Sequence, residues 1–224
     1  MSICESILQS GSKKGQSCGR IRCAVHHKEF KKEPKIIIAE EPLPDNKNHI
    51  FVFDTETTGL SKEICPRLVQ VAWRKYDSSG ELLSEKCILI FPDQFMIPDD
   101  AVKVHHLSQE YCENYGVPIK DFFAILRTEL STVGRLVAHN IRYDDMIISN
   151  ELERYGETEL FSEWKKIYRS CTMNMARSMK INSSFKLAEL YKYFFLREAE
   201  GELHQADTDT RLCAELYFYL STAT

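Results

Sequence analysis

Three strand-like segments follow one another in the first half of the chain, with no helix-like pattern between them. They cover residues 50–56, 67–77 and 82–91, and each is rich in β-branched and aromatic residues. A turn that contains glycine joins the first two. Consecutive strands of this kind form a meander, so this part of the chain is expected to build one side of a sheet.

Beyond residue 91 the pattern changes to strands that alternate with helices. Residues 119–131 have the apolar spacing of a helix, a buried strand is expected at 135–139, and IYRSC at 167–171 suits a short fifth strand. Further helix-like stretches lie near 143–155, 172–179, 186–195 and 207–221. A meander followed by this alternation predicts an α/β fold with a mixed five-stranded sheet flanked by helices.

Composition and targeting signals narrow the class of protein. A chain of 224 residues with 43% hydrophobic and 28% charged residues suits one full globular domain and a small additional module. It contains no run of about 18 apolar residues, and its N-terminus lacks the apolar stretch of a secretory signal. We therefore expect an intracellular protein, in the cytoplasm or nucleus, with no membrane partner and with reduced cysteines.

Charge is distributed unevenly along the chain. Residues 1–35 hold eight Lys or Arg against three Glu, a balance of +5, so the remainder of a chain with net charge −4 carries −9. A basic arm can bring an acidic body to a polyanion, and a solvated tail is the alternative. Three prolines and an acidic cluster at 34–48 are typical of a linker. We therefore divide the chain into a basic module at 1–33, a linker at 34–48 and the main domain at 49–224.

Two carboxylates share one face of the first strand. Side chains alternate along FVFDTE, so Asp54 and Glu56 point one way and Thr55 points the other. The rest of the strand is apolar and therefore buried, and paired buried carboxylates are costly unless a cation neutralises them. This favours a metal site, while two acids at a solvated strand end are the alternative. The TTGL turn that follows offers Gly59 for a positive φ.

Helical phase selects one acid from each of two later pairs. From Asp144, positions +3, +4 and +8 are the apolar residues Ile147, Ile148 and Leu152. Asp145 falls on a more exposed flank. From Asp209, positions +3, +4, +7, +8 and +11 are Leu212, Cys213, Leu216, Tyr217 and Leu220. Asp207 instead faces water, where we expect it to assist the start of the helix as a cap.

These acids and a nearby histidine define a chemistry. Oxygen ligands favour hard cations, so Asp54, Glu56, Asp144 and Asp209 are expected to hold two Mg²⁺ or Mn²⁺ ions about 3.5–4 Å apart. Such a pair activates water and stabilises a leaving 3′ oxygen in phosphodiester hydrolysis. His204 lies five residues before Asp209, in a loop, and histidine can accept the proton of that water near neutral pH.

The three motifs, in this order and spacing, resemble a known family. DTETTGL, HNIRYD and HQADTD are similar to the exonuclease motifs of the DEDDh (DnaQ-like) group, which includes the proofreading subunit of bacterial DNA polymerase III. The resemblance covers about residues 50–221. It implies an RNase H-like fold and hydrolysis of single-stranded or frayed 3′ ends to nucleoside 5′-monophosphates, with the four acids on metals and His204 as general base. It also favours DNA as the substrate and a polymerase or other replication or repair protein as a partner.

Substrate contacts are expected beside these motifs. Thr57, Gly59 and Leu60 follow Glu56, and the motif position of Leu60 suits a wedge against the terminal base, although core packing suits a leucine nearly as well. Asn140 follows a buried strand, where it either contacts substrate or serves as a turn residue. The segment VHHLS at 104–108 is similar to the family's HGI segment, but His106 replaces the glycine. The resemblance therefore decides neither the conformation of this turn nor a substrate contact there.

The basic module carries a second set of metal-ligand residues. Cys4, Cys18 and Cys23 with His26, or with His27 in its place, form a C-x13-C-x4-C-x2/3-H set that suits tetrahedral Zn²⁺. About 30 residues cannot bury a stable core alone, so a structural Zn²⁺ would explain an ordered module. The segment loosely resembles small CCCH zinc modules of nucleic-acid enzymes. A disordered basic tail with incidental cysteines is the alternative.

Other function classes remain open at this point. An exoribonuclease that trims RNA from the 3′ end is one alternative, although oligoribonucleases usually have a different first motif, with Met near its middle. A nucleic-acid-binding protein that retains the fold without activity, and a phosphodiesterase for small molecules, are further alternatives. The sequence also leaves open whether the chain forms a homodimer.

Overall fold

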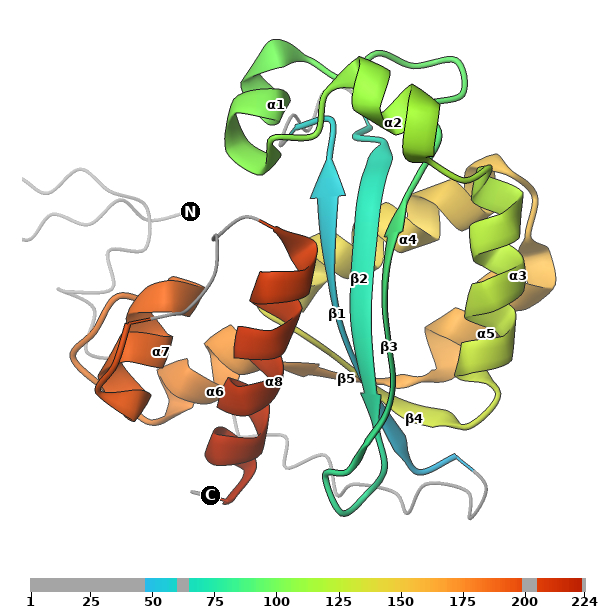
Figure 1. The fold of residues 1–224 in the computed structure, drawn as a ribbon. Helices are drawn as coiled ribbons and strands as arrows, with labels where there is room; N and C mark the ends of the chain where they lie inside the picture. The colour runs from blue at the N-terminus through green and yellow to red at the C-terminus, as the bar shows by residue number, and fades with distance from the viewer. Residues whose placement is uncertain (1–46, 60–64, 199–204, 223–224) are drawn as a thin grey trace, which may run out of the picture. The chain divides into compact units, whose positions relative to one another are not determined.

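The computed structural model describes residues 47–59, 65–198 and 205–222 (Figure 1). All of them belong to a unit that spans Leu43–Thr224. Several predicted features lie outside the described residues: the module at 1–33 with its zinc ligands Cys4, Cys18, Cys23 and His26 or His27, most of the linker at 34–48, the substrate residue Leu60 and the general base His204.

A mixed five-stranded sheet forms the centre of the fold (Figure 1). Its strands are β1 (His49–Thr57), β2 (Leu68–Tyr76), β3 (Leu82–Leu89), β4 (Val133–Ala138) and β5 (Tyr168–Cys171). They lie in the order β3-β2-β1-β4-β5, with β1 antiparallel to β2 and parallel to β4. The first three strands form the predicted meander, and the sheet with its flanking helices confirms the predicted fold.

Five of the described helices lie where the apolar spacing predicted them. They are α3 (Ile119–Leu130), α4 (Ile141–Arg154), α6 (Thr172–Ser178), α7 (Leu187–Phe195) and α8 (Ala206–Thr222). Three others were not predicted: α1 (Asp99–His105), α2 (Gln109–Tyr115) and α5 (Thr158–Lys166). Each of these has nine residues or fewer, as do the predicted helices α6 and α7. No helix in the described part of the chain is long and apolar enough to cross a bilayer.

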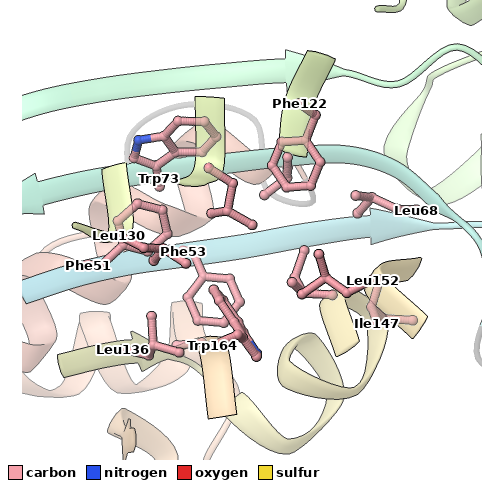
Figure 2. Packing of buried hydrophobic residues seen from close by; sticks show 14 of the residues in the cluster. Phe51, Phe53, Leu68, Trp73, Phe122, Leu130, Leu136, Ile147, Leu152 and Trp164 are labelled. Carbon is pink, nitrogen blue, oxygen red and sulfur yellow. The ribbon is translucent and has the colours of Figure 1, made fainter. Parts of the chain in front are cut away.

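Helices cover both faces of the sheet because its central strand is apolar on both sides. Phe51 and Phe53 of β1 pack with Trp73 and Trp164 in a large cluster toward α3, α4 and α5 (Figure 2). The ring centroids of Phe51 and Trp73 are 5.5 Å apart and those of Phe53 and Trp164 are 5.3 Å apart. Val52 points to the other face, where it packs against α8. The sheet is therefore a rigid support for residues near its edge.

The strand β4 ends before β1 does, and α4 begins in the space beyond it. The last pair between the two strands is Val52 with Val137, so the stretch 53–57 of β1 extends past β4. Asp145 holds the start of α4 in place, because its Oδ1 accepts hydrogen bonds from Trp164 Nε1 at 2.6 Å and from Arg169 at 3.0 Å. The first turn of α4 is thereby fixed beside the end of β1.

Candidate active site

Three carboxylates from β1 and α8 converge. Asp54 and Glu56 continue the face of β1 on which Val52 meets α8, and Asp209 lies in the first turn of α8. One oxygen of each carboxylate lies within 4.8 Å of the others, and all three side chains are partly exposed. This is close to the separation across a Mg²⁺ or Mn²⁺ shell, in which each oxygen lies about 2.1 Å from the ion. The strand alternation predicted for Asp54 and Glu56 is confirmed.

Asp144 lies in the first turn of α4 and is buried, with 4% of its surface exposed. Its Oδ1 accepts two hydrogen bonds from Thr55, one from the backbone N at 3.1 Å and one from Oγ1 at 2.8 Å. Among the charged neighbours of Asp54, Asp144 has the largest effect on its pKa, which it raises. Helical phase had indicated Asp144 rather than Asp145 as the buried acid, and the structure confirms this.

Burial and mutual repulsion raise the pKa values of these acids. Burial, with the charges of Asp209 and Asp144, raises the pKa of Glu56 to about 8. Burial raises the pKa of Asp144 to about 7, although the hydrogen bonds from Thr55 act in the opposite direction. The pKa of Asp54 is also well above its usual value, through burial first and then through the charges of Asp144, Asp209 and Glu56. Such a site gains stability from a cation, and an all-oxygen donor set fits Mg²⁺ or Mn²⁺.

The turn after Glu56 is tied to the first turn of α4. Gly59 has a φ of +138°, the positive value predicted for it, and a Cβ built there would meet no atom of the described residues within 4 Å. Thr57 Oγ1 donates to the carbonyl of Gly59 at 3.1 Å, and Tyr143 Oη donates to the same carbonyl at 2.7 Å. Tyr143 was not predicted to matter, and its position next to Asp144 was the only available signal.

Three residues near the sheet edge have distinct roles. Asn140 is exposed at the start of α4 in the left-handed conformation, with φ +63°, and its side chain does not cap the helix. His139 contributes to packing, because its ring nitrogens bond Thr172 Oγ1 at 2.8 Å and the Phe185 carbonyl at 2.9 Å. His106 takes the left-handed conformation with φ +62° and closes α1. The turn therefore forms without glycine.

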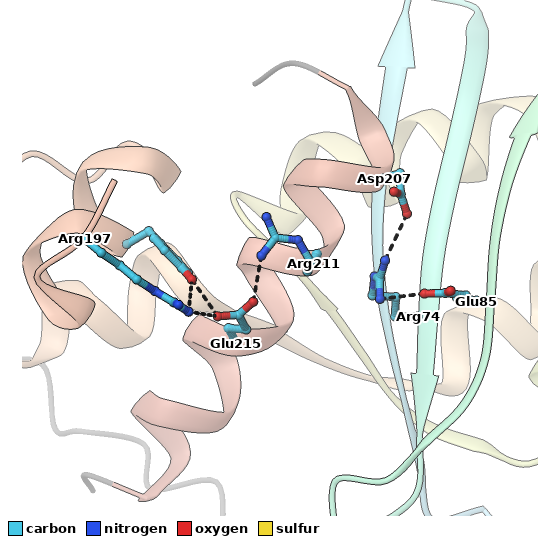
Figure 3. Close-up of polar contacts among 7 residues, drawn as sticks. Arg74, Glu85, Arg197, Asp207, Arg211 and Glu215 are labelled. Atoms are coloured by element: carbon cyan, nitrogen blue, oxygen red, sulfur yellow. Dashed lines mark hydrogen bonds and ion pairs between the residues drawn. The ribbon is translucent and has the colours of Figure 1, made fainter. Parts of the chain in front are cut away.

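The prediction that Asp207 caps a helix is wrong. Asp207 lies inside the first turn of α8, and its carboxylate accepts a hydrogen bond from Arg74 at 3.2 Å (Figure 3). Arg74 also pairs with Glu85 of β3 at 2.6 Å. Further along α8, Glu215 pairs with Arg197 at 3.0 Å. These contacts fasten α8 to the sheet and to the end of α7, and so help to fix the position of Asp209.

A groove of about 800 Å³ is lined by residues of β2, β3, α1 and α2 and by Asp207 in the first turn of α8. Its lining includes Gln70, which lies opposite Glu56 in the pairing of β1 with β2. It also includes Tyr111 and Tyr115 of α2, whose rings are 4.9 Å apart and whose surfaces are 47% and 69% exposed. Neither tyrosine was singled out from the sequence, because α2 was not predicted. The groove extends the site along the sheet toward β3.

The family model that matches this chain is the exonuclease family RNase_T, over residues 51–217. The chain is also similar to the ε subunit of DNA polymerase III from two bacteria. It is 28% identical to that of Rickettsia typhi over 177 residues and 29% identical to that of Rickettsia felis over 175 residues. Each match covers 76% of this chain and 73% of the subunit.

Solved structures of E. coli exonuclease I have a similar fold. The zinc-bound complex with single-stranded DNA is 18% identical with a TM-score of 0.64, and covers 80% of this chain and 41% of that chain. The complex with a dA16 oligonucleotide is 20% identical with a TM-score of 0.61, and the match covers 79% of this chain and 43% of that chain. The match thus spans about two fifths of exonuclease I, and at this identity it concerns the fold alone.

The region matched by the family model contains all three acidic motifs, from Asp54 to Asp209. The chain therefore belongs to the RNase_T family of exonucleases and is a DEDDh, DnaQ-like 3′–5′ exonuclease.

Proposed function

We propose that the enzyme requires divalent metal ions and removes nucleotides from the 3′ end of single-stranded or frayed nucleic acid, with DNA favoured, to release nucleoside 5′-monophosphates. The observation that carries this proposal is the convergence of Asp54, Glu56 and Asp209 within 4.8 Å, beside the buried Asp144. DNA is favoured because the similar ε subunits belong to a DNA polymerase and the similar exonuclease I is known in complexes with single-stranded DNA.

The four acids would hold two Mg²⁺ or Mn²⁺ ions. When bound, the ions supply the positive charge that makes a water acidic and stabilises the leaving 3′ oxygen. Asp54, on which the charges of Asp144, Asp209 and Glu56 all act, would hold the ions together with these three acids. His204 precedes the start of α8 by two positions and is proposed to take the proton of the attacking water. This route requires no covalent intermediate.

The groove beside Glu56 provides a path for the strand. We assign substrate contacts to Thr57, Gly59, Leu60 and Asn140, around the carboxylates. Tyr111 and Tyr115 supply exposed ring faces on which bases can stack, and stacking of this kind contributes about 1–3 kcal/mol per base in proteins that bind single strands. Stacking does not depend on base identity, which suits an enzyme that degrades any sequence.

Degradation of matched substrates labelled at either end tests the proposal. We expect Mg²⁺-dependent release of labelled mononucleotide from the 3′ end of single-stranded DNA, faster than from RNA or from a paired end. Asp144→Asn should abolish it. The matched control is Glu153→Gln, which alters an exposed acid of the same helix outside the carboxylate site and should keep the wild-type rate. Faster degradation of RNA would favour the exoribonuclease alternative, and binding without hydrolysis would favour a non-catalytic binding protein.

We also propose that residues 1–33 bind one structural Zn²⁺ through Cys4, Cys18, Cys23 and His26, with His27 as the alternative ligand. The support is the spacing of these residues and the basic charge around them. Metal analysis of the full chain should find one zinc ion that is lost in Cys18→Ser. Zinc content that is unchanged in this variant would refute the assignment.

The partner we propose is a polymerase or another replication or repair protein, since the similar relatives are polymerase subunits. Co-purification of the chain with a polymerase from its own cell is the test.

A further inference from the structure

Thr55 lies between Asp54 and Glu56 in the sequence, but it serves a third acid. Its side chain is buried, with 7% of its surface exposed. Its Oγ1 donates to Asp144 Oδ1 at 2.8 Å, and its backbone N donates to the same oxygen at 3.1 Å. One residue therefore directs two hydrogen bonds to one oxygen of a buried carboxylate.

The end of β4 explains why Asp144 can occupy this place. Pairing between β1 and β4 stops at Val52 and Val137, so the backbone of β1 has no strand partner on that side at Thr55. The backbone N of Thr55 donates to Asp144 instead. The Asp144 carboxylate thus accepts the backbone hydrogen bond that a longer β4 would otherwise accept, at the point where α4 begins.

We propose that Thr55 is a positioning residue that orients Asp144 for metal binding, an inference that rests on the proposed function. With Oδ1 held by two donors, the carboxylate cannot rotate freely, so the direction of Oδ2 is fixed as well. The hydroxyl of Thr55 is the part of this arrangement that a side-chain substitution can remove, since the backbone donor remains. Hydrogen-bond partners of metal ligands typically contribute a factor of about 10 to 100 in metal affinity or activity.

Titration of Mn²⁺ into the full chain, followed by electron paramagnetic resonance, measures this directly and without substrate. Thr55→Val keeps the shape and the β-branched strand preference but removes the hydroxyl, and should weaken Mn²⁺ binding about tenfold or more. Thr55→Ser restores the donor and should bind like the wild type. The matched control is Thr172→Val, which removes another buried hydroxyl, bonded to His139 at 2.8 Å. It should lower the unfolding temperature and leave Mn²⁺ binding unchanged.

A double-substitution cycle separates positioning from a general loss of structure. Because Thr55 acts through Asp144, Thr55→Val should have no further effect on Mn²⁺ binding once Asp144→Ala is present. Wild-type Mn²⁺ affinity in Thr55→Val, or an equal additional loss in the Asp144→Ala background, would overturn the inference. If the Mn²⁺ affinities of the wild type and the variants follow these expectations but the wild type hydrolyses no nucleic acid, the proposed function alone would be refuted. A wild-type chain that binds no Mn²⁺ would refute both.

Discussion

Glu56→Gln should stabilise the metal-free protein, and the gain should grow with pH. The pKa of Glu56 rises from 4.5 to about 8 through burial first and then through the charges of Asp209 and Asp144. Between these values the folded chain keeps a proton that the unfolded chain has lost. A carboxyl with a raised pKa therefore contributes stability that is fully present below about pH 4.5 and is lost as the pH rises through about 8. A neutral amide avoids this loss.

The size of the effect follows from the shift. At about 1.4 kcal/mol per pKa unit, the difference between 4.5 and about 8 corresponds to an upper limit of about 5 kcal/mol. Glu56 is partly exposed, and solvent screens its interaction with the neighbouring charges, so we expect about 2 kcal/mol. Urea unfolding in the presence of EDTA at about pH 5 and about pH 8.5 measures the difference between variant and wild type at each pH.

Glu153→Gln provides the matched control, since Glu153 is exposed on α4 and lies outside the carboxylate site. It should change stability little at either pH. Equal stability of Glu56→Gln and wild type at about pH 8.5, or a gain that shrinks as the pH rises, would refute the electrostatic reasoning.

Three further predictions follow from other contacts. Tyr143→Phe removes the hydrogen bond to the Gly59 carbonyl, so in steady-state kinetics KM should rise about fivefold with a smaller change in kcat. A fall in kcat with an unchanged KM would contradict a role for Tyr143 in holding the substrate-binding turn at Gly59. Glu151 is fully buried and accepts from Arg67 at 2.8 Å, so Glu151→Gln should destabilise by about 3 kcal/mol in urea unfolding, and a change under about 0.5 kcal/mol would count against this ion pair. Mg²⁺ at 100 times its Kd should stabilise the protein by about 2.7 kcal/mol per ion in thermal unfolding, reversibly with EDTA, and no shift would argue against the metal site.

Periodic features of the sequence predicted most of the fold. Phe51, Val52 and Phe53 alternate between two buried faces, and the repeat after Asp209 lies buried along α8. The same periodicity identified Asp144 rather than Asp145 as the buried acid, because apolar residues at helical spacing mark the face of the helix that is buried. Helices α1, α2 and α5 were not predicted, and their length does not explain this, because α6 and α7 are equally short and were predicted.

The contacts that complete the site depend on where elements end, which periodicity does not reveal. The bond from Thr55 to Asp144 exists because β4 stops short of β1. The salt link from Arg74 to Asp207 depends on the distance between α8 and the sheet, so Asp207 was wrongly predicted to be a cap. Such contacts arise from tertiary packing between residues far apart in the sequence.

The central claim is that Asp54 and its neighbours perform hydrolysis at a 3′ end. The most direct test compares wild type and Asp54→Ala on a 3′-labelled single strand of DNA with Mg²⁺, with folding checked by circular dichroism. The account predicts that a labelled nucleoside 5′-monophosphate is the first product of the wild type and that the folded variant forms none. Retained activity in Asp54→Ala, or longer labelled fragments as the first product, would contradict it.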